Sequence, residues 1–380
     1  MRRMLILLGA GLVLGGPFVV GYRLSAGSRA TTPVAIPSVV DEVRSALAAR
    51  YYRPVPDRVL QLGSVHQIIT ALRDPYTAYL APPDYRLVRQ ETASTYTGIG
   101  MSVLPARHGY VVVSLRPGPA ERAGVRVGDT VVRIGGVVAA RLSMSHALAR
   151  ILGPRGTTVQ LTLLRGGKTL DFGIRRERIQ APVVQARLLS YAGERWGDVQ
   201  LSGFRIGAAV VLGHELRTLA RQGALGFVLD LRQNPGGLLD QAVAVSSLFL
   251  DRGVVVSLVG RHEPREVFRA VGGVATRLPL VVLVDRFTAS SAEIVAAALR
   301  DHHRATLVGE PTFGKALVQS IDPLGNGAAL ELTIARYFTP SGADISNVGV
   351  VPQIHAVDHE RTAEDEALAV ALRVLARSAS

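Results

Sequence analysis

Residues 227–237 read FVLDLRQNPGG, and this stretch predicts the fold of the chain's main domain. It opens as an apolar run typical of a strand buried on both faces, and it closes on two glycines that let the backbone turn sharply. Similar apolar runs occupy residues 254–258 and 278–284, while segments 238–250 and 291–302 have helical spacing. Alternating strands and helices predict an α/β core with a mainly parallel sheet.

The pattern changes on either side of this core, which we assign to residues 181–358. Short strands with two helices, one of them amphipathic, at residues 96–180 predict a compact β-rich module inserted ahead of the core. Residues 38–95 have helical spacing, including a continuous helix expected at 59–72, and residues 359–380 are expected to form a C-terminal helix.

The amino-terminal residues have the pattern of a targeting segment. Arg2 and Arg3 precede an uncharged apolar run from Met4 to Gly21. Its length lies between that of a signal peptide and that of a spanning helix. We therefore expect residues 1–24 to act as a signal anchor or signal peptide, followed by a linker at 25–37. The basic start would stay in the cytoplasm while the rest is exported.

Composition narrows the function classes. The chain has 380 residues, no cysteine and nine histidines without the spacing of metal ligands, so we expect no metal site and no cofactor. The net charge is +13, carried by arginines that are scattered instead of clustered in a run. Nucleic-acid binding is therefore not expected, and a basic exported protein near an anionic membrane surface is the preferred interpretation.

Lysine is nearly absent from this basic chain. Of 43 lysines and arginines, only Lys168 and Lys315 are lysine. Lys168 lies in a predicted hairpin turn, whereas Lys315 lies among small and apolar residues. Because arginine keeps its proton in proteins and a buried lysine can lose it, Lys315 is a candidate general base. Its pKa would have to fall from ~10.4 by roughly 3 pH units, which burial can cause.

Ser290 follows the apolar run at 278–284 and opens a predicted helix. A serine at such a junction exposes its hydroxyl, and the next backbone amides can stabilise an oxyanion. The alternative is an ordinary helix cap in which Glu293 completes a capping box. Gly236 could supply a second oxyanion donor, and Gln319 could orient the Lys315 amine. A serine–lysine pair needs no histidine.

Several segments resemble the C-terminal processing, or tail-specific, serine peptidase family with a PDZ domain, across nearly all of residues 38–357. The matching segments are Asp74–Leu80 (DPYTAYL), Gly98–Gly100 with Pro117–Asp129, Asp230–Gly237 (DLRQNPGG), Gly309–Lys315 (GEPTFGK) with Gln319, and Ala335–Gly342 (ARYFTPSG). The resemblance implies an α/β, crotonase-like peptidase core with a helical N-terminal segment and an inserted β-rich PDZ domain.

The resemblance also assigns roles in the peptidase core. The nucleophile would be Ser290, with Ser291 as the less favoured alternative, and the general base would be Lys315. Gly236 and the amide of Ser291 would form the oxyanion hole. Phe287 stands where the family usually has glycine, and the serine stretch that follows departs from the family order.

In the PDZ domain, the resemblance implies a binding site for a substrate's C-terminal carboxylate on the backbone amides of Ile99 and Gly100. Ile99, Met101 and the helix at 143–152 would line a pocket for an apolar terminal residue. Leu152 replaces a basic residue found in many members near the end of this helix, so coupling of binding to activation can differ here.

The leading hypothesis is an endopeptidase on the extracytoplasmic side of a bacterial cytoplasmic membrane, in the periplasm or cell envelope. Its substrates would be polypeptides with apolar C-terminal tails. One alternative is a catalytically impaired PDZ scaffold that binds tails, and another is an esterase or amidase for small substrates. The PDZ domain is hypothesised to inhibit the site at rest. Homo-oligomerisation and an activating adaptor are left open.

Overall fold

The computed structural model describes residues 7–8, 38–91, 95–142, 144–180, 183–261, 264–357 and 365–379. The chain divides into two compact units, one of Met1–Tyr79 with Val184–Ser380 and one of Leu80–Val183. The second unit starts earlier than the boundary expected at residue 96, because α4 (Pro82–Glu91) packs against α6 (Met144–Ile151) of the β-rich module.

A mainly parallel sheet in the larger unit confirms the predicted α/β layer. In spatial order its strands are β11 (Val184–Tyr191), β12 (Glu194–Leu201), β13 (Phe227–Asp230), β17 (Leu280–Val284), β18 (Thr306–Gly309) and β21 (Ile354–His355). β11 pairs antiparallel with β12, and the other neighbours pair in parallel. Every residue of β13 and β17 is buried, as expected for strands covered on both faces.

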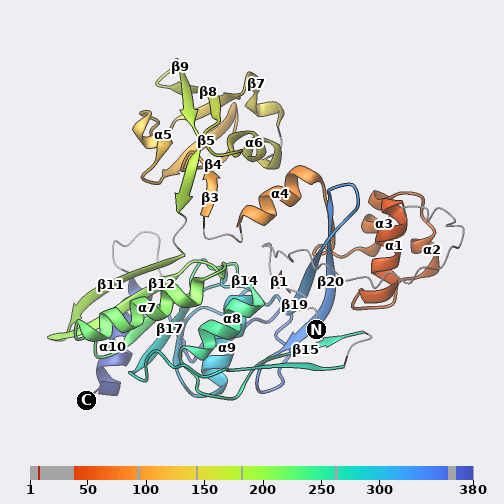
Figure 1. Ribbon diagram of the computed structural model, residues 1–380. Helices are drawn as coiled ribbons and strands as arrows, with labels where there is room; N and C mark the ends of the chain where they lie inside the picture. Colours follow the sequence, from red (N-terminus) through yellow and green to blue (C-terminus); the bar gives the residue numbers. More distant parts are fainter. Residues whose placement is uncertain are drawn as a thin grey trace, which may run out of the picture. The chain divides into compact units, whose positions relative to one another are not determined.

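Helices cover both faces of this sheet (Figure 1). Val228 packs in a cluster with α10 (Glu366–Ala379), which confirms a C-terminal helix. Phe227 points to the opposite face, where it lies beside Leu219 of α7 (Ala208–Arg221). Adjacent residues of a strand face opposite sides, so the apolar run of β13 contributes to both packed layers.

A second sheet completes the larger unit. In spatial order its strands are β14 (Gly237–Leu238), β1 (Leu7–Leu8), β19 (Leu317–Pro323), β20 (Ala329–Phe338), β15 (Val254–Gly260) and β16 (Glu266–Arg269), with β2 (Ala78–Leu80) also paired to β20. Two helices, α8 (Leu239–Ser247) and α9 (Ser291–Asp301), pack against each other and both contact β14 and β15.

The N-terminal helices α1 (Val39–Arg50), α2 (Asp57–Leu60) and α3 (Val65–Leu72) share a hydrophobic cluster with β20. The continuous helix expected at 59–72 is wrong. α2 ends at Leu60, and Ser64 starts α3 by accepting a hydrogen bond from Gln67 N–H at 3.3 Å. A serine side chain favours a helix start over a helix interior, which explains the break.

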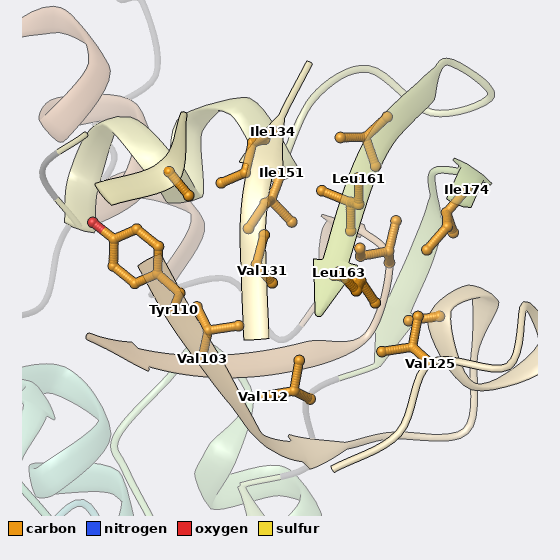
Figure 2. Close-up of a cluster of buried hydrophobic side chains, with 14 of the residues drawn as sticks. Val103, Tyr110, Val112, Val125, Val131, Ile134, Ile151, Leu161, Leu163 and Ile174 are labelled. Atoms are coloured by element: carbon orange, nitrogen blue, oxygen red, sulfur yellow. The ribbon is translucent and has the colours of Figure 1, made fainter. Parts of the chain in front are cut away.

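The smaller unit contains the predicted β-rich module. Its main sheet is formed by β4 (Met101–Ala106), β5 (Gly109–Leu115), β6 (Thr130–Ile134), β8 (Thr158–Arg165) and β9 (Lys168–Arg175), with β7 (Val137–Val138) paired to β6. Figure 2 shows side chains of these strands and of Ile151 from α6 turned towards one core. α5 (Pro119–Arg122) lies between β5 and β6 in the chain, and β3 (Thr95–Gly98) pairs with β10 (Glu177–Gln180).

The predicted signal segment at 1–24 lies outside the described residues apart from β1, and the linker at 25–37 lies outside them entirely. Within the ranges that the structure describes, none of the helices has the length and apolar character needed to cross a membrane.

Candidate active site

Three loops that carry predicted site residues leave one edge of the parallel sheet. They follow β13, β17 and β18 and hold Gly236, Ser290 and Lys315 respectively. Parallel strands end on the same edge, so residues far apart in the chain meet there. Two backbone hydrogen bonds join the loops: Ala289 N–H to Asn234 O at 2.9 Å, and Phe313 N–H to Thr288 O at 3.0 Å.

Ser290 occupies a strained turn at the start of α9. Its φ is 62° and its ψ is −119°, a conformation that L residues rarely adopt. Such strain costs free energy and persists only where the surroundings enforce it, commonly at functional sites. The expectation of an exposed hydroxyl is wrong, because the strained turn holds Ser290 at 0% exposure. Ser290 Oγ has no hydrogen-bond partner among the residues that the structure describes.

Ser291 differs from its neighbour in the state of its hydroxyl. Ser291 Oγ donates a hydrogen bond to Gly237 O at 2.8 Å. Its backbone N–H, at the first position of α9, has no acceptor in the described part of the chain. The Ser291 hydroxyl is therefore bonded while the Ser291 N–H is free. This favours Ser290 as the nucleophile and the Ser291 N–H as a hydrogen-bond donor to an oxyanion.

Gly236 lies directly against these two serines. A Cβ on Gly236 would be 2.8 Å from Ser290 Cβ and 2.9 Å from Ser291 N, so only glycine fits without a shift. Its φ of 99° also requires glycine. The Gly236 N–H donates to Asn234 Oδ1 at 2.9 Å, and Asn234 is itself fully buried. Gly236, the predicted second oxyanion donor, therefore lies beside both serines, and its N–H is bonded to Asn234 in this structure.

Glu293 joins the serine loop to the lysine loop. Its fully buried carboxylate accepts hydrogen bonds from Ser290 N–H at 2.7 Å and from Lys315 N–H at 2.9 Å, both on Oε2. The other oxygen accepts from Gly314 N–H at 2.7 Å and from the Thr312 hydroxyl. The expected link from Glu293 to the backbone of Ser290 is present, and the same side chain also sets the backbone of Lys315.

The burial of Lys315 shifts its amine towards the neutral form. The residue is 7% exposed, and burial lowers its pKa to about 8. Carboxylates of Glu331, Asp74 and Glu293 oppose this shift because they favour the ammonium form. Lys315 Nζ lies over the ring of Tyr76, 4.4 Å from its centroid. The direction of the pKa shift is the one expected for a general base.

Gln319 is fully buried on β19, opposite Thr333 of β20. Neither of its amide atoms has a hydrogen-bond partner among the described residues, so the expected bond to the Lys315 amine is not formed here. The register between β19 and β20 shifts at this point, because Val318 pairs with Ala335 and Gln319 pairs with Thr333, which leaves Ile334 of β20 as the extra residue.

The sequence pattern assigns no role to three residues near the lysine, namely Asp74, Tyr76 and Glu331. The separation of these residues from Lys315 in sequence hides their proximity. The one available signal was the placement of a charged residue, Glu331, inside an apolar alternating strand.

In the smaller unit, the predicted carboxylate-binding loop has two backbone N–H groups without an acceptor among the described residues. Ile99 and Gly100 use their carbonyls for the amides of Ala120 and Arg116, and Gly100 has a φ of 81°. Their own N–H groups have no acceptor within the described ranges. The Ile99 side chain differs from expectation, because it is 1% exposed inside the core and does not line an open pocket.

Groups of three or more histidine, aspartate or glutamate side chains that could hold a metal ion are not found in the part of the chain that is described.

Comparisons with known proteins identify a family for each of the two units. Residues 195–356 match peptidase family S41, and residues 97–175 match the PDZ domain. The carboxyl-terminal-processing protease of Synechocystis sp. is 38% identical over 306 residues, which are 79% of this chain and 72% of that protein.

Two further relatives are similar. The carboxy-terminal processing protease CtpA of Bacillus subtilis is 33% identical over 80% of this chain and 66% of its own length. The solved photosystem II D1 C-terminal processing protease is 29% identical, with a TM-score of 0.58 over 90% of this chain and 98% of that structure's chain. This chain belongs to the carboxyl-terminal processing proteases of peptidase family S41, and it is therefore a protease with a PDZ domain.

Proposed function

We propose that this protease is a serine endopeptidase that cleaves exported proteins after recognising their C-terminal tails, with Ser290 as nucleophile and Lys315 as general base. The observation that carries the proposal is the buried lysine, whose pKa is lowered to about 8, in a loop that shares Glu293 with the strained serine. A buried amine with a pKa near the working pH suits a general base.

In this mechanism the neutral Lys315 amine accepts the Ser290 Oγ proton as Oγ attacks the scissile carbonyl carbon. The oxyanion accepts hydrogen bonds from the amides of Ser291 and Gly236, the latter after it leaves Asn234. The Lys315 ammonium then protonates the leaving amine as the C–N bond breaks, which leaves an acyl-enzyme ester. Lys315 next accepts a proton from the attacking water and returns it to Ser290 Oγ. Gln319 orients the amine.

Tail recognition is assigned to the PDZ domain. The free amides of Ile99 and Gly100 suit a terminal carboxylate, and an extended peptide would add along β4, which is an edge strand of its sheet. Met101 and α6 would contact the apolar terminal side chain.

Export is proposed from the basic and apolar pattern of residues 1–24, which would also attach the protein to the membrane. The protein would then act on the extracytoplasmic side of a bacterial cytoplasmic membrane. A homo-oligomer and an activating adaptor are compatible partners in that location.

The test is cleavage of an unfolded protein with an apolar C-terminus by the chain from Ala26 onward. Ser290→Ala and Lys315→Ala should each abolish cleavage while circular dichroism shows an intact fold. Lys168→Ala, at the other lysine of the chain, should leave cleavage unchanged. Cleavage that survives Ser290→Ala would refute the assignment of Ser290 as the nucleophile. If the unsubstituted chain binds tails without cleaving them, that result would support the scaffold alternative.

A further inference from the structure

The loop Asp74–Thr77 connects α3 to β2 and is fixed by buried hydrogen bonds. The Asp74 carboxylate accepts from Tyr51 OH at 3.1 Å, from Tyr76 N–H at 3.0 Å and from the Thr77 hydroxyl at 2.8 Å. Thr77 Oγ1 also accepts from the backbone N–H of Thr333 on β20, at 3.1 Å. These bonds on both sides of Tyr76 therefore fix the backbone from which its ring projects.

The Tyr76 ring faces the amine of Lys315. The distance from Nζ to the ring centroid is 4.4 Å, inside the range where an ammonium is attracted to an aromatic face. Among the described residues, Lys315 Nζ has no hydrogen bond to Ser290 Oγ or to Gln319. The amine thus lies on the ring and not on the nucleophile.

The groups with which the amine would react or bond lack hydrogen-bond partners. Ser290 Oγ and both amide atoms of Gln319 are buried without a hydrogen-bond partner in the described part of the chain. Unpaired buried polar atoms are costly, so an amine that moved towards them would gain hydrogen bonds. A second position of the amine, in which it bonds to Ser290 and Gln319, would satisfy these atoms.

We propose that the Tyr76 ring is the resting seat of the Lys315 amine, which makes Tyr76 a positioning residue that competes with Ser290 for the general base. The inference rests on the proposed function for the role of Lys315. A ring attracts the ammonium but not the neutral amine, so loss of the proton releases Lys315 to accept a hydrogen bond from Ser290 Oγ. The seat thereby couples the position of the lysine to its protonation.

Other charged groups also face the amine. They are Glu331 from β20, Asp74 from the Tyr76 loop and Glu293 from α9, and all three favour the ammonium form. They are unchanged by substitution of Tyr76, so a comparison of Tyr76 variants isolates the effect of the ring.

The chain offers a direct probe because it has only two lysines. In the full chain labelled with ¹³C on lysine Cε, NMR should give two signals, with exposed Lys168 as the internal reference. The Lys315 signal should show an upfield ring-current displacement in the parent and in Tyr76→Phe, and should lose it in Tyr76→Leu. The titration midpoint of Lys315 should fall by roughly half a pH unit to one pH unit in Tyr76→Leu only.

Tyr85→Leu is the matched control, since it removes a ring that carries Arg89 at 5.8 Å and should not change the Lys315 signal. The acid limb of kcat/KM should move to lower pH in Tyr76→Leu, by the same amount as the titration, and stay in place in Tyr76→Phe.

The absence of ring-current displacement in the parent would overturn the inference without need of any variant. An unchanged Lys315 titration in folded Tyr76→Leu would do the same. Because NMR reports the seat without catalysis, activity that persists in Ser290→Ala would refute the proposed function while leaving the seat to its own test.

Discussion

Glu293 positions both halves of the candidate site with one buried carboxylate. Burial raises its pKa, and hydrogen bonds from Thr312, Ser290, Gly314 and Lys315 oppose the increase because they stabilise the charged form. A carboxylate accepts on both oxygens and donates nothing, which suits a point where four donors converge. A helix-capping residue can therefore also link the backbones of Ser290, the proposed nucleophile, and Lys315, the proposed base.

Glu293→Gln should lower kcat by about 10- to 100-fold with little change in KM. The amide NH2 would face a buried donor and leave it unpaired, which costs about 1–3 kcal/mol. Steady-state kinetics beside a thermal melt measure this, with exposed Glu121→Gln as the control. An unchanged kcat in folded Glu293→Gln would show that Glu293 does not position the site.

Gly236→Ala should abolish cleavage, because the new Cβ would lie 2.8 Å from both Ala289 O and Ser290 Cβ. Gly193→Ala is the matched control: Gly193 also has a positive φ, of 79°, but open space around it. It should cost about 1 kcal/mol of stability and preserve activity. Chemical denaturation and cleavage assays separate the two effects, and an active Gly236→Ala variant would contradict the close packing.

At the scale of elements, β20 supports three parts of the site. Glu331 and Thr333 are two residues apart, as expected for side chains on one face of a strand, and Tyr337 lies four residues beyond Thr333 on the same strand. Glu331 acts on the charge of Lys315, Thr333 holds the Tyr76 loop, and Tyr337 OH donates to Ser290 O at 3.4 Å. A strand outside the parallel sheet thus aligns loops that come from elsewhere in the chain.

Glu331→Gln should move the acid limb of the activity profile to lower pH. Burial raises the pKa of Glu331 to about 7, and its carboxylate in turn raises the pKa of Lys315, which is about 8. Removing the negative charge lowers the pKa of Lys315, so more neutral amine is present at a given pH below it. The measurement is kcat/KM against pH; a limb that moves upward or stays would exclude this coupling.

At the scale of the whole molecule, the protease domain and the PDZ domain belong to two separate compact units. Each unit has its own buried core, and the second is inserted between β2 and β11 of the first. An insertion with a separate core can bind a ligand without repacking the peptidase core.

Free peptide with an apolar C-terminus should increase cleavage of a reporter that lacks such a tail, if the PDZ domain inhibits at rest as hypothesised. A peptide that binds the Ile99 and Gly100 amides more tightly in the uninhibited state than in the inhibited state would shift the protein towards the uninhibited state. The assay compares the peptide with its C-terminal amide, which lacks the carboxylate. Equal cleavage with and without the acid peptide, at concentrations where binding is measured, would contradict inhibition at rest.

The sequence alone predicted the α/β core, the β-rich insertion and the two local features with the clearest physical signature. Those features are the glycine pair after β13 and a lysine retained in a chain of arginines. Both depend on intrinsic properties of the residue type, namely the backbone freedom of glycine and the ability of lysine to lose its proton. The continuous helix at 59–72 was wrong because a local cap at Ser64 outweighed the helical spacing.

Only the tertiary structure decided what surrounds the lysine. Tyr76, Glu331 and Glu293 reach Lys315 from a loop, a strand and a helix that no local pattern connects. It also decided that the Ser290 hydroxyl is unpaired while that of Ser291 is bonded, and that the Gly236 amide rests on Asn234. Burial, pKa and hydrogen-bond pairing are properties of an environment, and that environment exists only once distant segments have packed together.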